Sequence, residues 1–179
     1  MRGMWLVLAV AGLSVPAAAQ DMGAFTTGPV FEDFGPHAAV EGITQVPAET
    51  EFAVAFDVAE PAKEGERNKS VKSAARFINM HVAAGVPEDN IRVAVVVHGK
   101  AVLDLLNPEG RTAHELGDNA SAAMIREMLD EGVRLIVCGQ SATAQGVSQE
   151  ELIPGVEMAL SAMTAFALLQ QAGYTVNPF

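Results

Sequence analysis

Cysteine is almost absent from this sequence: Cys138 is the only one among 179 residues. A single cysteine cannot form a disulfide within the chain, so an apolar core has to supply the stability. It also leaves one thiol whose presence needs an explanation. The search for function therefore starts from Cys138.

Basic residues are also scarce. The chain has 11 lysines and arginines against 22 aspartates and glutamates, which gives a formal net charge of −11 at pH 7. A protein of this charge repels the phosphates of nucleic acid and the anionic surface of a membrane. We therefore expect neither as a partner.

Several motifs of common enzymes are missing. The sequence has no G-x-G-x-x-G, no P-loop and no G-x-S-x-G, which speaks against dinucleotide, ATP and serine-hydrolase chemistry. His37, His81 and His114 have no ligand spacing with one another or with Cys138, so we expect no structural metal site and no cofactor. A site made of His98, Cys138 and a carboxylate stays open, because neighbours in space need not be neighbours in sequence.

Long apolar runs are limited to the N-terminus. Residues 4–15 are apolar, Arg2 precedes them, and residues 17–19 are alanines. This order is typical of a secretory signal peptide, and the run is shorter than the ~20 residues that span a bilayer. We expect residues 1–20 to be a signal peptide and the mature protein to be periplasmic or secreted, without a membrane span. An uncleaved N-terminal anchor is the alternative.

The remainder divides into two parts. Residues 21–50 are rich in glycine and proline without steady periodicity, which indicates an irregular arm. In residues 51–179, short aliphatic runs alternate with amphipathic stretches, which predicts one α/β domain with a mostly parallel, open sheet of about five strands. Strands are expected at 51–58, 91–97, 133–137, 156–160 and 174–176. Helices are expected after Asn68, after Asp118 or Asn119, and over 161–171, with loops at 107–118 and 142–155. Residues 156–160 also fit a longer helix by periodicity alone.

Two of the expected strands end in chemically active side chains. The candidate site residues are His98 and Gly99 after the strand at 91–97, and Cys138, Gly139, Gln140 and Ser141 after the strand at 133–137. The carboxyl ends of parallel strands form the functional edge of such sheets. Neighbouring strands lie ~4.8 Å apart, so His98 and Cys138 share a pocket if their strands are neighbours.

The residues after Cys138 suit a reactive thiol. Only a thiolate is nucleophilic, and backbone N–H groups at a strand-to-helix turn, or a nearby histidine, lower the pKa of a thiol. Gly139 lets the chain turn, while Gln140 and Ser141 add donors for a sulfur anion or an oxyanion. The alternative is an inert cysteine buried at the end of a core strand.

Four stretches together resemble the DsrE/DsrF-like sulfur-oxidation family. They are residues 132–141 around Cys138, residues 146–155, the strand at 93–97 with His98-Gly99, and the closing residues 168–174. The resemblance implies a three-layer α/β/α fold and an oligomer of two, three or six chains. It also implies that Cys138 receives and passes sulfur as a persulfide. From its expected proximity alone, His98 would stabilise the Cys138 thiolate or lie in a subunit contact.

Three functions follow as hypotheses. The first is an exported carrier that moves sulfane sulfur between donor and acceptor proteins through Cys138, and that is a carrier more than a turnover enzyme. The second is a module of the same fold that binds a small molecule or a subunit, with Cys138 buried and unreactive. The third is a thiol-dependent enzyme, which needs a base within hydrogen-bond reach of the sulfur.

Overall fold

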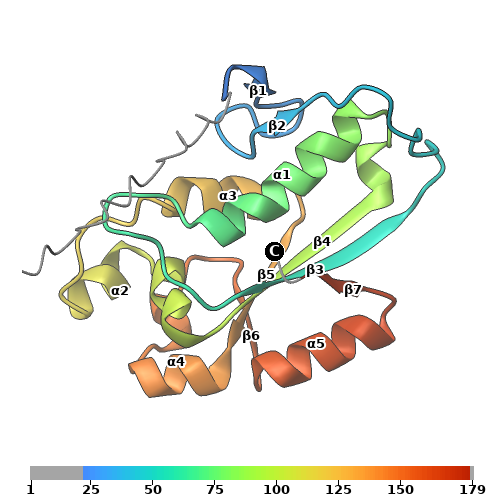
Figure 1. Cartoon of the computed structure of the whole chain (residues 1–179). Helices are drawn as coiled ribbons and strands as arrows, with labels where there is room; N and C mark the ends of the chain where they lie inside the picture. Colours follow the sequence, from blue (N-terminus) through green and yellow to red (C-terminus); the bar gives the residue numbers. More distant parts are fainter. Residues whose placement is uncertain (1–21, 178–179) are drawn as a thin grey trace, which may run out of the picture.

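The computed structural model describes residues 22–177, and its centre is a five-stranded parallel sheet (Figure 1). The strand order is β6-β5-β4-β3-β7. The strands are β3 (Phe52–Val58), β4 (Ile91–Val97), β5 (Arg134–Cys138), β6 (Glu157–Ala159) and β7 (Thr175–Asn177). The predicted α/β class is confirmed, and residues 156–160 contain a strand, β6, and not the start of a longer helix. The expected signal peptide lies outside the described residues.

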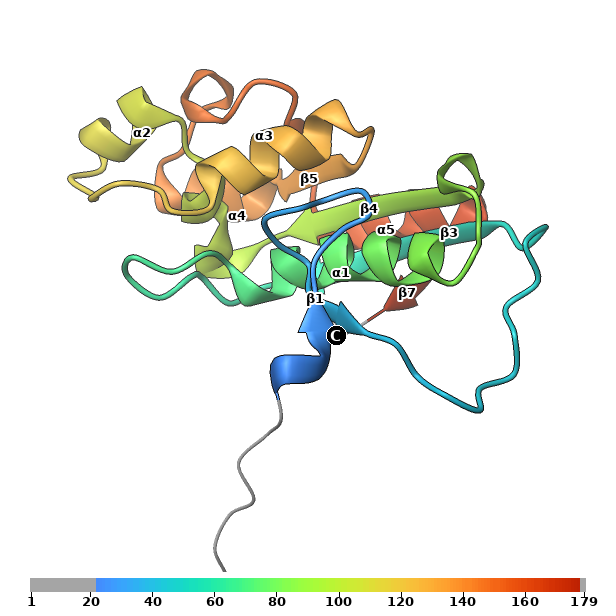
Figure 2. The same cartoon turned by 90° about the horizontal axis from the view of Figure 1, so that it is seen from above.

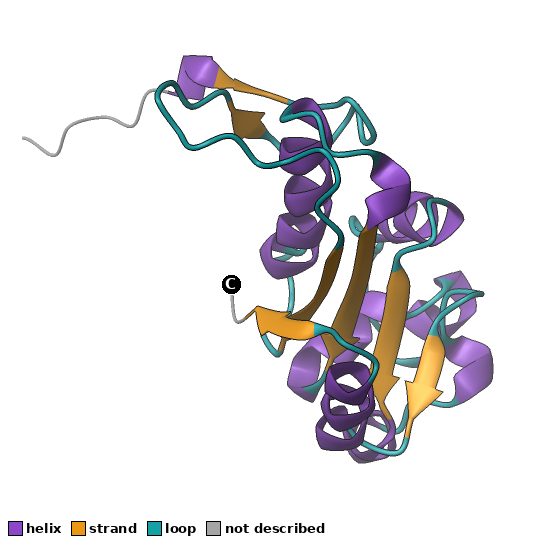
Figure 3. Cartoon of the chain, turned by 90° about the vertical axis from the view of Figure 1, so that its right-hand side faces the viewer, coloured by secondary structure: helices purple, strands orange, loops and turns teal. Residues whose placement is uncertain are grey.

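Helices cover both faces of the sheet, as Figure 3 shows. On one face, α1 (Lys69–Ala83) and α3 (Ala122–Asp130) enclose the larger apolar cluster. On the other, α5 (Ala162–Gln171) covers a smaller cluster of mostly short side chains. We call these the α1 face and the α5 face. No helix within residues 22–177 has the length and apolarity to cross a membrane.

A capping side chain defines where α1 begins. The Asn68 side-chain oxygen accepts hydrogen bonds from the backbone N–H of Ser70 and of Val71, both at 3.0 Å. This satisfies two of the four N–H groups that lack a partner in the first turn of a helix. The expectation that Asn68 caps a helix is confirmed.

Two expected loops turn out to contain helices. Residues 107–118 include α2 (Pro108–Ala113), which Asn107 caps through Gly110 N, and residues 142–155 include part of α4 (Gly139–Gln145) and the 3₁₀ turn η4 (Gln149–Glu151). Both α-helices are too short for an apolar stripe to show in the sequence. Further 3₁₀ turns are η2 (Glu88–Asn90) and η3 (Gly99–Leu105), the latter within the apolar stretch between β4 and α2.

The expected start of α3 is also wrong. The helix begins at Ala122 with Ser121 at the N-cap position, and not directly after Asn119. The Asn119 amide instead donates to the carbonyl oxygens of Asp104 and Leu106. The Asn119 side chain therefore connects the loop before α3 to η3. Nothing in the sequence around Asn119 indicates this contact.

The N-terminal segment packs beside α1 (Figure 2). It contains η1 (Met22–Ala24) and a small antiparallel pair, β1 (Phe25–Thr26) and β2 (His37–Ala38). Phe31 and Phe34 are buried, with ring centroids 4.8 Å apart. A Cβ at Gly35 would lie 2.8 Å from the Ala75 backbone, so only glycine permits this approach to α1.

One side chain holds this segment to α1. Asn79 is fully buried, and its oxygen accepts from Val30 N at 3.1 Å and Phe31 N at 2.8 Å. Its amide donates to the carbonyl oxygens of Phe31, Phe34 and Gly35 at 3.0–3.1 Å. Much of the expected arm is therefore ordered against the domain by apolar burial and by a buried polar contact.

The candidate site around Cys138

Cys138 lies where β5 ends and α4 begins. It is the last residue of β5 and the N-cap of α4, with extended backbone angles (φ −71°, ψ 113°). The residue is only 5% exposed. Its sulfur accepts a hydrogen bond from the backbone N–H of Ser141 at 3.5 Å, so the thiol itself caps the helix.

The first turns of two helices supply donors to this sulfur. The N–H groups of Gln140 and Ser141 come from α4, and that of Ala162 is the first of α5. Burial by itself raises the pKa of Cys138. Hydrogen bonds from the hydroxyl and backbone of Ser141 and from the other two N–H groups outweigh this effect and bring the pKa below its usual value. The arrangement therefore favours the thiolate.

Gly139 is required by a close approach at this turn. A Cβ there would lie 2.7 Å from the carbonyl oxygen of Ala159, at the end of β6. A real Cβ does not fit at that distance, so any larger residue would push the β6–α5 junction away from the turn. That junction carries the Ala162 N–H, so Gly139 keeps it near the sulfur.

Gln140 and Ser141 have different tasks. The Gln140 side chain donates to the carbonyl oxygen of Leu160 at 3.3 Å, so only its backbone N–H serves the sulfur. The Ser141 oxygen accepts from the backbone N–H of Gly99 at 3.0 Å and its hydroxyl hydrogen-bonds to the sulfur. Ser141 thus connects the ends of β4 and β5.

The strands that carry His98 and Cys138 are neighbours. β4 and β5 pair in parallel with Val97 opposite Val137, and His98 and Cys138 follow this pair. The His98 ring is turned toward β3, where its Nε2 lies 2.8 Å from Oδ1 of Asp57. The donors that lower the pKa of the thiol come from Ser141, Ala162 and Gln140. The structure thus brings His98 to the same edge but gives it Asp57 as its hydrogen-bond partner.

Asp57 is not among the candidate site residues predicted from the sequence. The signal that singles it out is a lone carboxylate inside an otherwise apolar strand, between Phe56 and Val58. Both of these neighbours are buried, while the Asp57 side chain is 41% exposed. An acid in that position adds nothing to the apolar core, and its hydrogen bond to His98 makes Asp57 a further candidate site residue.

Exposed apolar side chains surround the α5 side of the site. Met158, Leu160, Met163 and Leu168 are 41–80% exposed on β6 and α5, and we call them the α5 patch. Beside them lies a cavity of 240 Å³, bordered by the Arg134–Glu157 ion pair with N···O 2.7 Å. Exposed apolar side chains that cluster in this way are typical of interaction surfaces.

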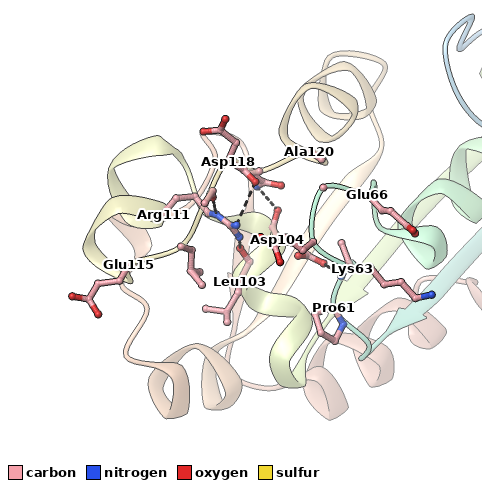
Figure 4. Close-up of a pocket in the computed structure, with 15 residues that line it drawn as sticks. Pro61, Lys63, Glu66, Leu103, Asp104, Arg111, Glu115, Asp118 and Ala120 are labelled. Atoms are coloured by element: carbon pink, nitrogen blue, oxygen red, sulfur yellow. Dashed lines mark hydrogen bonds between the residues drawn. The ribbon is translucent and has the colours of Figure 1, made fainter.

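Another cavity lies away from Cys138. It measures 580 Å³ and opens between the loop after β3 and the loop before α3 (Figure 4). Its charged walls hold these loops together: Arg111 donates to the carbonyl oxygens of Gly117, Leu103 and Asp118, and Asp104 accepts from Ala62 N at 2.7 Å. The residues that border it do not include Cys138 or His98. Across residues 22–177, no three His, Cys, Asp or Glu side chains converge as a metal site would require.

Comparison with known proteins points to one family. The model of the DsrE/DsrF-like family matches residues 52–178. Among solved structures, the protein of unknown function MTH1491 from Methanobacterium thermoautotrophicum superposes with a TM-score of 0.51 at 18% identity. The ychN protein of E. coli does so with a TM-score of 0.51 at 19% identity. Each comparison covers 72% of this chain and 100% of the other. No curated protein sequence matches the chain.

Proposed function

Because this chain belongs to the DsrE/DsrF-like family, which is generally linked to sulfur relay, we propose that it is a sulfur carrier in which Cys138 accepts and passes sulfane sulfur. The observation that carries the proposal is the set of N–H and hydroxyl donors that lowers the pKa of Cys138 despite its burial. A carrier needs a thiolate to accept sulfur and a shielded site to keep it. Cys138 combines a lowered pKa with a buried position.

The chemistry is a thiol exchange on a persulfide donor. The Cys138 thiolate attacks the outer sulfur of the donor, the donor S–S bond breaks, and its electron pair stays on the inner sulfur as a thiolate. No external oxidant or reductant is consumed. The same donors that stabilise the Cys138 thiolate stabilise the persulfide anion, which a partner thiol then attacks to take the sulfur onward.

The proposed partners are other proteins, including further copies of this chain. The α5 patch lies next to the turn that carries Cys138, so a protein docked on it comes close to the thiol. The net charge of −11 favours partners without strong acidity. We also propose export to the periplasm or outside the cell, on the basis of the sequence of residues 1–20.

A second candidate function is favoured by one observation. Cys138 is 5% exposed, which also suits a structural cysteine in a module that binds a small molecule or a subunit. In such a module the thiol would resist modification in the native protein. The two functions therefore differ in a property that is simple to measure.

The test is the intact mass of the native protein after incubation with glutathione persulfide. We expect a gain of one sulfur, about 32 Da, that reductant removes and that is absent from Cys138→Ser. The carrier function is refuted if no sulfur is gained and if Cys138 also resists iodoacetamide until the protein is unfolded. That second result would support the binding module.

A further inference from the structure

Asp57 and His98 form a pair that the carrier chemistry above leaves unused. Nε2 of His98 lies 2.8 Å from Oδ1 of Asp57, and the two side chains are 31% and 41% exposed. An ionised carboxylate only accepts hydrogen bonds, so Nε2 is the protonated nitrogen and Nδ1 is free to exchange a proton. Asp57 therefore sets the tautomer and the orientation of the ring.

This pair and Cys138 lie on three adjacent strands in the order β3, β4, β5. Each of the three residues has a valine beside it in the sequence. The side chains of these valines belong to the apolar cluster on the α1 face: Val58, Val97 and Val137. Successive side chains of a strand point to opposite faces, and His98 and Cys138 keep extended backbone angles. Asp57, His98 and Cys138 therefore all project from the α5 face at the carboxyl edge.

The neighbouring helices bring no other ionisable side chain to this row. Neither α4, with the sequence GQSATAQ, nor α5, with AMTAFALLQQ, contains an acid, a base or a second thiol. Proton transfer at the sulfur therefore uses no side chain of α4 or α5, and His98 is the imidazole at the end of the strand next to that of Cys138.

We propose that Asp57 is a positioning residue that holds His98 as the proton donor to the thiol released when Cys138 takes up sulfur. The inference rests on the proposed carrier function. The groups that lower the pKa of Cys138 are N–H and hydroxyl donors and not His98, so the place left for a proton from His98 is the leaving sulfur.

The step balances in protons and electrons. The Cys138 thiolate forms a bond to the outer sulfur of the donor persulfide, and the donor S–S bond breaks. Nδ1 of the neutral His98 takes the proton of that outer sulfur and passes it to the inner sulfur, which receives the electron pair of the broken bond and leaves as a thiol. The new persulfide stays on Cys138 as the anion, and His98 is again neutral with its proton on Nε2, beside the Asp57 carboxylate.

The experiment compares two reagents that differ in their leaving group. Glutathione persulfide releases an alkyl thiolate, which needs a proton to leave well, whereas 5,5′-dithiobis(2-nitrobenzoate) releases an aromatic thiolate that leaves as the anion. For Asp57→Asn we expect loading from glutathione persulfide to slow about tenfold, and the reaction with the aromatic disulfide to change less than about twofold. His98→Ala should show the same selectivity with a larger loss, on the order of 100-fold.

Matched variants keep the result interpretable. Glu60→Gln removes an exposed acid that follows the same strand and should leave both rates unchanged. Asp57→Glu keeps the carboxylate and should restore part of the rate with the persulfide, which tests the idea even if Asp57→Asn folds poorly. A ¹⁵N spectrum of His98 should show the Nε2–H tautomer in the wild type and in Asp57→Glu.

The outcomes separate this inference from the function on which it rests. Equal slowing with both reagents would mean that Asp57 only supports the fold, and no slowing with either would mean that it has no part in the reaction; both overturn the inference. A wild-type protein that takes up no sulfur refutes the carrier function itself, and the inference with it. A wild type that loads sulfur while Asp57→Asn loads equally fast refutes the inference alone.

Discussion

The two faces of the sheet are built from different side chains. On the α1 face, large residues such as Phe56, Leu135 and Met128 are at most 2% exposed and join the aromatic rings of the N-terminal segment. On the α5 face, the strands contribute short side chains such as Ala55 and Ala94 beneath a single helix. Most of the apolar burial, and hence most of the stability it provides, is on the α1 face.

The difference explains where polar and reactive side chains are tolerated. A core that stabilises the fold from one face allows polar groups on the other face, at the strand ends, without unfolding the protein. Asp57, His98 and Cys138 occupy these positions, and the first turn of α5 brings the Ala162 N–H to the sulfur. The comparison predicts that substitutions on the α1 face change stability, whereas those at the edge of the α5 face change reactivity.

The largest effect is expected for Phe56→Ala. Phe56 is 2% exposed on the α1 face, and its truncation leaves a cavity that costs about 4 kcal/mol in the free energy of unfolding. Leu169→Ala on the α5 face should cost less, about 2 kcal/mol, because fewer side chains surround it. Urea unfolding of both variants measures this, and an equal or larger loss for Leu169→Ala would break the comparison.

Asn79→Ala is expected to loosen the N-terminal segment. The substitution leaves the buried N–H groups of Val30 and Phe31 without an acceptor, which costs about 2 kcal/mol. Hydrogen exchange should show faster exchange at Phe31, while the amides of β4 keep their protection. Met80→Ala, an adjacent and partly exposed change on α1, is the control. Unchanged exchange at Phe31 would mean that packing of Phe31 and Phe34 alone holds the segment.

Ser141→Ala is expected to change reactivity more than stability. It removes the hydroxyl that helps to lower the pKa of Cys138, so that pKa should rise and the rate of alkylation near neutral pH should fall by several fold, equivalent to about 1 kcal/mol. The profile of iodoacetamide alkylation against pH should shift to higher pH. Thr143→Ala, on the exposed side of α4, should not shift it.

The lowered pKa of Cys138 also determines how the stability of the protein depends on pH. Folding stabilises the Cys138 thiolate, so this contribution is present above the pKa of the unfolded thiol and is lost as the pH falls through the lower pKa of the folded protein. Ser141→Ala should weaken this alkaline contribution. A variant whose stability is unchanged at alkaline pH, with an unshifted alkylation profile, would show that the hydroxyl does not act on the sulfur.

The smallest effect is expected at the opposite edge of the sheet, with Glu88→Gln. Burial, then the charges of Glu131 and Asp89, raise the pKa of Glu88, so its ionised form opposes folding. The wild type therefore loses stability as the pH rises through that raised pKa, and the variant should be more stable at neutral pH by about 0.3 kcal/mol, a small gain because the side chain is exposed. Thermal unfolding at pH 3 and pH 7 measures it, with Glu109→Gln as the control. A gain that persists at pH 3 would exclude the electrostatic cause.

The pattern of apolar residues predicted most of the domain, because burial imposes its period on the chain. The β-branched run at 91–97 and the short run at 156–160 both contain the expected strands. Asn68 correctly indicated the start of α1. The short helices α2 and α4 were not predicted, because a helix of one or two turns shows no apolar stripe in the sequence. The late start of α3 was not predicted, because the Asn119 side chain donates a hydrogen bond to a carbonyl oxygen on η3, which is distant in sequence.

The candidate site divides in the same way. Local sequence was enough to place Cys138, Gly139 and Ser141 together at the end of a strand, because they are consecutive or nearly so and strand ends share an edge. It could not show that Ala162, more than twenty residues away, donates to the sulfur, or that His98 turns to Asp57. These contacts depend on the strand order and on the closure of β6 and α5 onto the turn. Side-chain period is a property of neighbouring residues, whereas hydrogen-bond partners across strands exist only once the tertiary structure has formed.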